Sequence, residues 1–421
     1  MQLTPLLSIS LINAIVCCNI RMDAIVTRPM STSAQNLFAN SAYTVSLWTA
    51  AHVAAIVDAP VPEAPLIEAG AARALLPEHD LWDLWPLQNP DGSVAEIAGG
   101  ALWMVLSAPR QPDPGMRHNI ARTRLIFHSR GHWHDCGLLF PDALNPGSRE
   151  WSGSACYDAA TGNVAAYFTA AGRHDDTAHS FEQRLFQTTG MLDLSGPLPV
   201  IGHWTNAEPL VSNDGTHYVD LSKDQGMPGN IRGFRDPYWF RDPKDGCAYI
   251  LFTGSQPNGV PDCNGVIGIA SATISGVPDF ELMPPVVSAD GVANEMERPH
   301  MLVRDGLYYL FWSSQHSVFA TNGPHGPTGL YGMVGASVTG PFEPLNGTGL
   351  VIANPAHEPR QAYCWQVLET LEVASFVDHW GLQGRDPLAD PALNRAHFGG
   401  TIAPMLKIEI NGATTKLSGL A

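Results

Sequence analysis

Two short apolar runs flank a turn signal in ERPHMLVRDGLYYLFW, residues 297–312. The runs are Met301–Val303 and Leu307–Trp312, and the Arg304-Asp305-Gly306 segment between them contains the Asp-Gly pair that is typical of a tight hairpin. Both runs are shorter than the roughly 10 residues expected of a helix. The stretch therefore predicts a β-hairpin, with Glu297 and Arg298 immediately before its first strand.

The same pattern recurs along most of the chain. Further apolar runs, each bounded by turn signals, are Ala101–Leu106, Thr123–His128, Val164–Thr169, Ala248–Phe252, Val266–Ala270 and Val351–Ala353. Many short strands predict an all-β domain, which could be a sandwich, a barrel or a propeller. No clean repeat of about 40 to 50 residues is visible, so periodicity does not choose among the three.

The N-terminal part of the chain differs from the rest. Thr49 before Ala50–Ile56 predicts a short N-capped helix. The Pro- and Ala-rich segment from Pro60 to Pro77 predicts an extended arm that wraps the domain. No linker composition interrupts the remainder, so we predict a poorly defined segment over residues 1–40 and a single catalytic domain over residues 41–421.

The apolar run Leu6–Cys18 has the length of a signal-peptide core, but the first basic residue, Arg21, follows it instead of preceding it. The localisation therefore stays open between secretion without a standard signal peptide and the cytoplasm.

The charge and cysteine content exclude some functions. A net charge of −17 argues against nucleic-acid and anionic-membrane partners, because both need basic surfaces. The 7 cysteines are scattered without a Cys-x-x-Cys pair. His132 and His134 share a strand face, but no third ligand follows at a suitable spacing. We therefore predict no metal ion and no cofactor.

Three segments place a carboxylate beside a rigid or bulky neighbour: Trp82-Asp83-Leu84-Trp85-Pro86, Arg235-Asp236-Pro237 and Glu297-Arg298-Pro299. Cleavage of a sugar acetal needs an acid for the departing oxygen, a carboxylate that attacks the anomeric carbon, and a group that holds the hydroxyls. Three carboxylates and two guanidinium groups in one pocket would suit this reaction.

Arg-Asp-Pro also occurs at residues 241 and 385, but only Arg235 leads into an aromatic strand, Tyr238–Phe240. Taken alone, each segment has a structural explanation as well. Asp83 could be a turn residue, Glu297 could form a salt bridge, and aromatic residues such as Trp151 and Tyr363 could be core.

Seven stretches nevertheless occur in the order of one known family. The chain resembles glycoside hydrolase family 68, the levansucrases, inulosucrases and related bacterial β-fructofuranosidases, from about residue 47 to about residue 410. The stretches are Leu81–Gln88, Glu150–Ala155, Phe234–Pro237, Gly265–Ala270, Glu297–His300, Gly340–Gly347 and Gln361–Tyr363. The resemblance implies a five-bladed β-propeller with the active site in a central acidic funnel.

The resemblance also implies roles for individual residues. Asp83 would be the nucleophile, Glu297 the general acid/base, and Asp236 the carboxylate that grips two fructose hydroxyls and stabilises the transition state. Substrate-binding residues would surround them. These are Trp82, Trp151, Ser152, Arg235, Glu295, Arg298, Gln315 and Tyr363, with Ser152 bonded to the nucleophile and Arg235 orienting Asp236.

Two residues depart from the family pattern. Thr253 stands where the family has glutamate, and Gln315 stands where it has histidine or arginine. Both positions belong, in the family, to the glucosyl and acceptor side of the pocket. We therefore expect a weaker hold on the acceptor, so that hydrolysis and short oligosaccharides prevail over long levan.

The sequence thus predicts a levansucrase-like retaining enzyme that cleaves sucrose and passes fructose to water, sucrose or fructo-oligosaccharides. A mainly hydrolytic β-fructofuranosidase is the alternative of the same class. A non-catalytic fructan-binding propeller is the alternative from another class, which the complete carboxylate set argues against.

Overall fold

The computed structural model describes residues 44–272, 279–387 and 389–421. Strands dominate these ranges. The described α-helices are α2 (Ala50–Ala54) and α3 (Pro391–His397), and the 3₁₀ turns are η1 (Ala55–Asp58), η2 (Pro114–Asn119), η3 (His316–Val318) and η4 (Leu345–Gly347). In this part of the chain no helix has the length and apolar character needed to cross a membrane.

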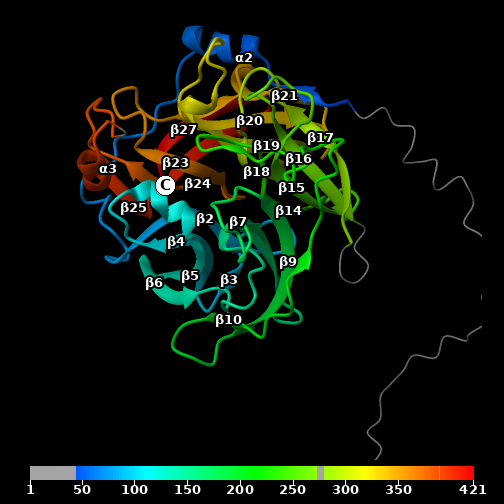
Figure 1. Cartoon of the computed structure of the whole chain (residues 1–421), viewed down its shortest axis with the longest axis vertical. Coiled ribbons are helices and arrows are strands. Elements are labelled where there is room, and N and C mark those ends of the chain that lie inside the picture. The colour runs from blue at the N-terminus through cyan, green and yellow to red at the C-terminus, as the bar shows by residue number, and fades with distance from the viewer. Residues whose placement is uncertain (1–43, 273–278, 388) are drawn as a thin grey trace, which may run out of the picture. The chain divides into compact units, whose positions relative to one another are not determined.

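The strands form five antiparallel blades around a common centre (Figure 1). Blade I has β2 (His79–Gln88), β4 (Gly100–Pro109), β5 (Arg122–Ser129) and β6 (His132–Leu138). Blade II has β7 (Arg149–Asp158), β8 (Asn163–Ala171), β9 (Gln183–Asp193) and β10 (Val200–Gly202). Blade III has β14 (Phe234–Arg241), β15 (Ala248–Ser255), β16 (Gly265–Ala272) and β17 (Glu281–Ser288). Blade IV has β18 (Glu297–Arg304), β19 (Leu307–Ser314), β20 (Gly329–Gly335) and β21 (Phe342–Pro344). Blade V has β23 (Ala362–Val367), β24 (Glu372–His379), β26 (Leu406–Asn411) and β27 (Thr414–Leu420).

Short strands extend these blades at their edges. β3 (Glu96–Ile97) pairs with β4, β11 (Glu208–Pro209) with β9, β22 (Leu350–Ala353) with β20, and β25 (Phe398–Ile402) with β24. β1 (Ser46–Leu47) lies parallel to β17, and β12 (Gly226–Met227) pairs with β13 (Asn230–Ile231). A short parallel pairing of β2 with β7 joins the first two blades into one sheet. The predicted all-β, five-bladed propeller is confirmed.

The hairpin predicted from residues 297–312 is formed by β18 and β19, whose ends pair at Arg304 and Leu307. Asp305 and Gly306 between them have φ values of 52° and 78°, as a two-residue hairpin turn requires. The other predicted runs lie within β4, β5, β8, β15, β16 and β22. The local pattern of apolar residues was sufficient to predict these strands, because each strand buries apolar side chains between blades.

The N-terminal segment is fixed to blades III and IV. The predicted helix is confirmed as α2, where the Thr49 backbone N–H donates to His52 Nδ1 at 3.0 Å. Trp48 is 1% exposed, packs edge-on against Trp312, and donates from Nε1 to the Thr348 carbonyl at 2.9 Å. The segment is thereby held by packing as well as by the pairing of β1.

The predicted arm follows α2 and runs along blades IV and V without forming a regular strand. Glu63 makes an isolated parallel bridge to Ala353 in β22, and the Ile67 backbone N–H donates to Gln361 Oε1 at 3.1 Å. The predicted segment 1–40 and the run Leu6–Cys18 lie outside the described residues, so the domain boundary near residue 40 stays a prediction.

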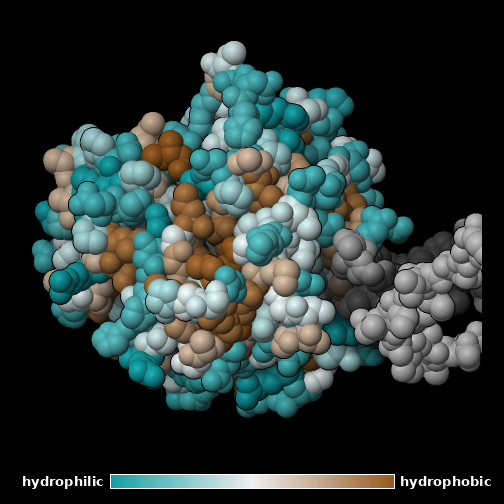
Figure 2. Space-filling model, turned by 90° about the horizontal axis from the view of Figure 1, so that it is seen from below, coloured by the Kyte–Doolittle hydropathy of each residue, from teal (hydrophilic) through white to brown (hydrophobic). Residues whose placement is uncertain are grey.

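The apolar core lies between neighbouring blades. Phe168, Phe234, Phe252, Trp312 and Trp365 are among its fully buried side chains. On the side of the molecule nearest β10, apolar residues gather near the middle and hydrophilic residues surround them (Figure 2). Because the core is divided among the blade interfaces, the centre of the ring is left for polar side chains.

Candidate active site

A cavity of about 500 Å³ opens where the innermost strands begin. The predicted site residues that line it are Trp82, Asp83, Trp151, Ser152, Arg235, Asp236, Glu295, Glu297 and Gln315. They come from β2, β7, β14, β18 and the segments beside β18 and β19. The inner strands of a propeller run in one direction, so their first halves meet at one end of the ring.

The innermost strand of each blade has a break in its pairing register in its first half. The breaks lie at Trp82/Leu84, Trp151/Gly153, Arg235/Tyr238, Glu297/His300 and Tyr363/Gln366. The first residues inside the breaks are Asp83, Ser152, Asp236, Arg298 and Cys364, and all of these but Ser152 have positive φ. Such bulges re-aim side chains and are concentrated at active sites. Three of these bulge residues, Asp83, Ser152 and Asp236, line the cavity.

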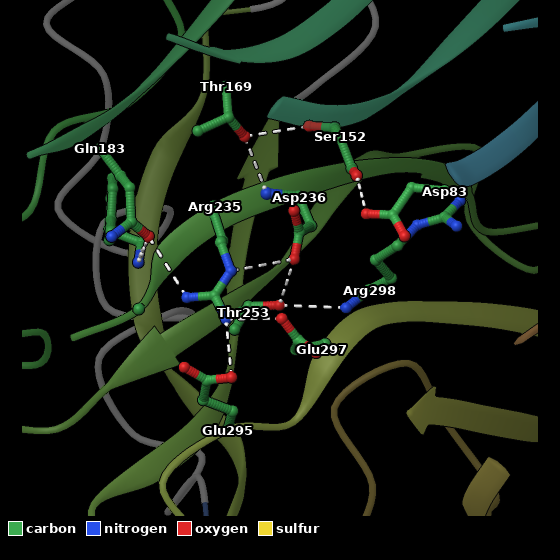
Figure 3. Close-up of polar contacts among 12 residues, drawn as sticks. Asp83, Ser152, Thr169, Gln183, Arg235, Asp236, Thr253, Glu295, Glu297 and Arg298 are labelled. Carbon is green, nitrogen blue, oxygen red and sulfur yellow. Dashed lines mark hydrogen bonds and ion pairs between the residues drawn. The ribbon is translucent and has the colours of Figure 1, made fainter. Parts of the chain in front are cut away.

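Asp83 is held by the serine of the next blade. Ser152 Oγ donates to Asp83 Oδ2 at 2.7 Å (Figure 3). Burial raises the pKa of Asp83, while Arg298 and the Ser152 hydroxyl oppose that rise. The predicted contact between Ser152 and Asp83 is therefore present.

Asp236 is 6% exposed and lies between two blades. Its Oδ2 accepts from Thr253 Oγ1 at 2.9 Å, and its backbone N–H donates to Thr169 Oγ1 at 2.9 Å (Figure 3). Burial raises the pKa of Asp236 to about 6, against the opposing charge of Arg235. The carboxylate of Asp236 is thus fixed in direction.

Arg235 joins the carboxylates of two blades. Its Nη2 lies 2.8 Å from Glu297 Oε1 and 3.2 Å from Glu295 Oε2, and its Nε lies 3.5 Å from Asp236 Oδ2. The other oxygen of Glu297, Oε2, accepts from the Tyr363 hydroxyl. Burial raises the pKa of Glu295 to about 7, although Arg235 opposes this shift. One guanidinium group therefore partly balances three carboxylates.

Two predicted site residues do not line this cavity. Arg298 is 6% exposed, and its Nη2 donates to the Leu84 carbonyl at 2.7 Å and to Gln366 Oε1 at 3.0 Å. The Arg298 side chain lies close to Asp83, on the side away from the cavity. Tyr363 touches Glu297 from behind and lines a neighbouring cavity.

Thr253, which we predicted on the acceptor side of the pocket, does not line the cavity. Its side chain is 0% exposed, and its hydroxyl contacts Asp236 and accepts from the Arg298 backbone N–H at 3.1 Å. Thr253 pairs directly with Arg235 across β14 and β15, which places it beside Arg235 and Asp236. It has no surface with which to contact an acceptor.

Sequence reasoning missed His118 on η2. Its ring lies edge-on to Trp82 with centroids 5.5 Å apart, and its carbonyl accepts from Trp151 Nε1 at 3.1 Å. Burial lowers the pKa of His118 well below its usual value, so the imidazole facing the cavity is neutral. The signal available was Asp113-Pro114, a cap and first-turn pair that predicts a helical turn but not its closeness to the site.

Other residues around the cavity entrance were also missed. They include Asn119, His179, Phe181 and Ser317, which belong to connections between strands, and Ile231 in the short strand β13. In the described ranges, no group of three or more His, Cys, Asp or Glu side chains could hold a metal ion.

Comparisons with known proteins found similar sequences and structures. The family model described as "Levansucrase/Invertase" matches residues 37–260 and 253–419. A levansucrase of Zymomonas mobilis subsp. mobilis is 33% identical over 395 residues, which cover 87% of this chain and 89% of the relative. An extracellular sucrase of the same organism is 30% identical over 366 residues, covering 80% of this chain and 84% of the sucrase.

A solved structure, the inulosucrase from Halalkalicoccus jeotgali bound to kestose, superposes with a TM-score of 0.82. It is 34% identical, and the superposition covers 90% of this chain and 96% of the inulosucrase.

Proposed function

This chain belongs to the levansucrase/invertase family, glycoside hydrolase family 68, and from that premise we propose which of its residues cleave sucrose. The protein is a levansucrase-like fructosyltransferase and hydrolase. The observation that carries the assignment is that Asp83 and Glu297 line one cavity with different partners. Asp83 accepts from a neutral hydroxyl, and Glu297 lies between a guanidinium group and a tyrosine hydroxyl.

In the first step, Asp83 attacks the anomeric carbon of the fructosyl unit. The bond to the glucosyl oxygen breaks, Glu297 gives its proton to that oxygen, and a fructosyl ester forms on Asp83. Asp236 accepts hydrogen bonds from fructose hydroxyls, while Arg235 keeps Asp236 and Glu297 in position. Glucose then leaves with the proton.

In the second step, Glu297 removes a proton from water or from a sugar hydroxyl. The oxygen attacks the same carbon, the ester bond breaks, and Asp83 is released as a carboxylate. Two displacements retain the configuration of the fructosyl unit. Arg298 and Thr253 act from beneath the site by positioning Asp83 and Asp236.

Incubation with sucrose tests this function and separates its alternatives. Glucose in excess of free fructose would show transfer, and equal amounts would show a hydrolytic β-fructofuranosidase. Absence of both sugars would favour a binding module and contradict the proposal. Measuring the two sugars at several times in one reaction is sufficient.

The product ratio is expected to depend on Gln315, which lies at the end of β19 and lines the cavity. Gln315→His restores the imidazole that we inferred from the family pattern, and an additional hydrogen bond to an acceptor should raise the ratio of transfer product to free fructose by about three- to tenfold. Gln315→Glu, of similar length but with no donor, is the control. Abundant long levan from the unmodified protein would contradict this expectation.

Ser152 is expected to set the acid side of the pH profile. Its hydroxyl lowers the pKa of Asp83, so Ser152→Ala should raise that pKa. Because the nucleophile must be ionised, the acid limb of kcat/KM for sucrose should move to higher pH. In the control, Ser154→Ala, the lost hydroxyl bonds to the Pro237 carbonyl instead of Asp83. Identical acid limbs for wild type and Ser152→Ala would refute the assignment.

A further inference from the structure

A second cavity, of about 560 Å³, lies beside the first, between η2 of blade I and the β24 and α3 segments of blade V. Gly115, His118 and Gln315 line both cavities. We propose that the second cavity binds the sugar units of a fructan acceptor that lie beyond the unit that reacts. The proposal rests on the proposed function and specifies where its acceptor is held.

The second cavity is on the side of the site that an acceptor must use. An acceptor hydroxyl has to reach Glu297, which removes its proton. Tyr363, whose hydroxyl donates to Glu297, lines the second cavity, whereas Asp83 and its partner Ser152 line only the first. A sugar chain that leaves the reacting centre past His118 and Gln315 therefore enters the second cavity directly.

The sizes of the two cavities support the same division. The first, at about 500 Å³, is in the range of sites that enclose one drug-sized ligand, and the two rings of sucrose fit that description. A trisaccharide acceptor and the fructosyl ester together have two more sugar rings than sucrose, and these rings need further space. The second cavity has a similar volume and shares lining residues with the first.

The lining of the second cavity suits a neutral polyol. The His379 ring is held between Asp378 Oδ1, 2.9 Å from Nδ1, and Asn394 Oδ1, 2.7 Å from Nε2. Asn394 Nδ2 in turn donates to Asp113 Oδ1 at 3.3 Å. The cavity is thus lined by carboxylate acceptors together with amide, imidazole and guanidinium groups. Because the lining contains both negative and positive charges, it does not favour an anionic ligand.

Arg360 supplies hydrogen-bond donors that the protein itself does not use. Among the described residues its guanidinium group donates no hydrogen bond, although it interacts electrostatically with Asp378. The rings of Tyr363 and Phe376, with centroids 6.4 Å apart, add apolar surface for a sugar face. The guanidinium group can donate hydrogen bonds to two neighbouring hydroxyls of a sugar whose ring face packs against the aromatic rings.

The wall formed by α3 is fixed before any ligand binds. Arg395 of α3 contacts Asp80 of β2 through two nitrogens, at 2.7 and 3.0 Å, and Asp80 is fully buried. A buried bidentate ion pair is geometrically specific. The cavity is therefore preformed, so binding does not require ordering of α3.

The test compares acceptor use in arginine variants given sucrose and an excess of kestose, the sugar bound in the solved inulosucrase. The measured quantity is the ratio of tetrasaccharide to free fructose at equal sucrose conversion. Arg360→Ala should lower this ratio by about tenfold or more, because a charged hydrogen bond to the acceptor is lost. Arg360→Lys, which keeps a cationic donor, should have an intermediate ratio.

The matched control is Arg304→Ala, because Arg304 lies at the far end of β18 beside a separate cavity. It should keep the wild-type ratio. A ratio for Arg360→Ala within twofold of wild type, or an equal fall in Arg304→Ala, would overturn the acceptor site. Failure of the unmodified protein to release glucose from sucrose would instead overturn the proposed function.

Discussion

Replacement of Asp83 by asparagine is expected to lower kcat for sucrose by about four orders of magnitude or more, because no fructosyl ester can form. The fold should persist. Burial raises the pKa of Asp83, so its charge costs stability, and an amide oxygen at the same place can still accept from Ser152. The unfolding temperature should therefore equal or exceed that of the wild type. Turnover and thermal unfolding measured on one preparation check both statements.

A small external nucleophile separates loss of the nucleophile from general damage to the site. Asp83→Ala leaves space in which azide can attack the anomeric carbon from the side of Asp83. The product would be a fructosyl azide of inverted configuration, since only one displacement occurs. Near wild-type activity of Asp83→Asn, or rescue with retained configuration, would show that another residue is the nucleophile.

The strands could be predicted from sequence because their causes are local. A run such as Leu307–Trp312, next to an Asp-Gly turn, has few alternatives to a strand, and it is β19 in the structure. The ring of five blades could not be predicted this way. The equivalent bulge residues Asp83, Ser152, Asp236, Arg298 and Cys364 are unequally spaced, because the connections between blades differ in length. The five-fold relation is therefore visible in the strands but not as a repeat in the sequence.

The resemblance supplied the list of site residues, but it did not show which of their side chains line the cavity and which are buried behind it. Arg298 and Thr253 both stand next to motif residues, and sequence gives no measure of which side chain faces the cavity. The register of β14 with β15 sets Thr253 opposite Arg235, and the bulge at Arg298 turns that residue beneath Asp83. Such placements depend on pairing between strands and on bulges, which apolar patterns do not encode.

The surroundings of Glu297 were only partly predicted. The resemblance named Tyr363, at the start of blade V, as a site residue, but it gave no sign that His118, in a 3₁₀ turn of blade I, adjoins the same cavity. Their closeness results from closure of the ring, which brings the first and last blades together. The second cavity has the same origin, so no sequence motif marks it.

Replacement of Glu297 by glutamine is expected to lower kcat/KM for sucrose by about 10²- to 10⁴-fold, because glucose departs poorly without a proton. Glutamine keeps the shape of the side chain, its amide oxygen can still accept from Arg235, and its amide NH2 can donate to the Tyr363 hydroxyl. The loss should depend on the leaving group. With a nitrophenyl β-fructofuranoside, whose phenolate needs little protonation, ester formation should be nearly normal. A burst of nitrophenol should follow, because the second step lacks its base.

Glu295→Gln is the matched control for this behaviour. Glu295 contacts the same nitrogen of Arg235, lies two residues from Glu297 and also lines the cavity, but the Tyr363 hydroxyl donates to Glu297 instead of Glu295. If Glu295 only binds the sugar, its loss should affect sucrose and the nitrophenyl substrate by the same factor and produce no burst. Stopped-flow measurement of nitrophenol release in both variants distinguishes the two residues. A burst in Glu295→Gln and none in Glu297→Gln would exchange their roles, with the carboxyl whose pKa burial raises to about 7 then acting as the acid.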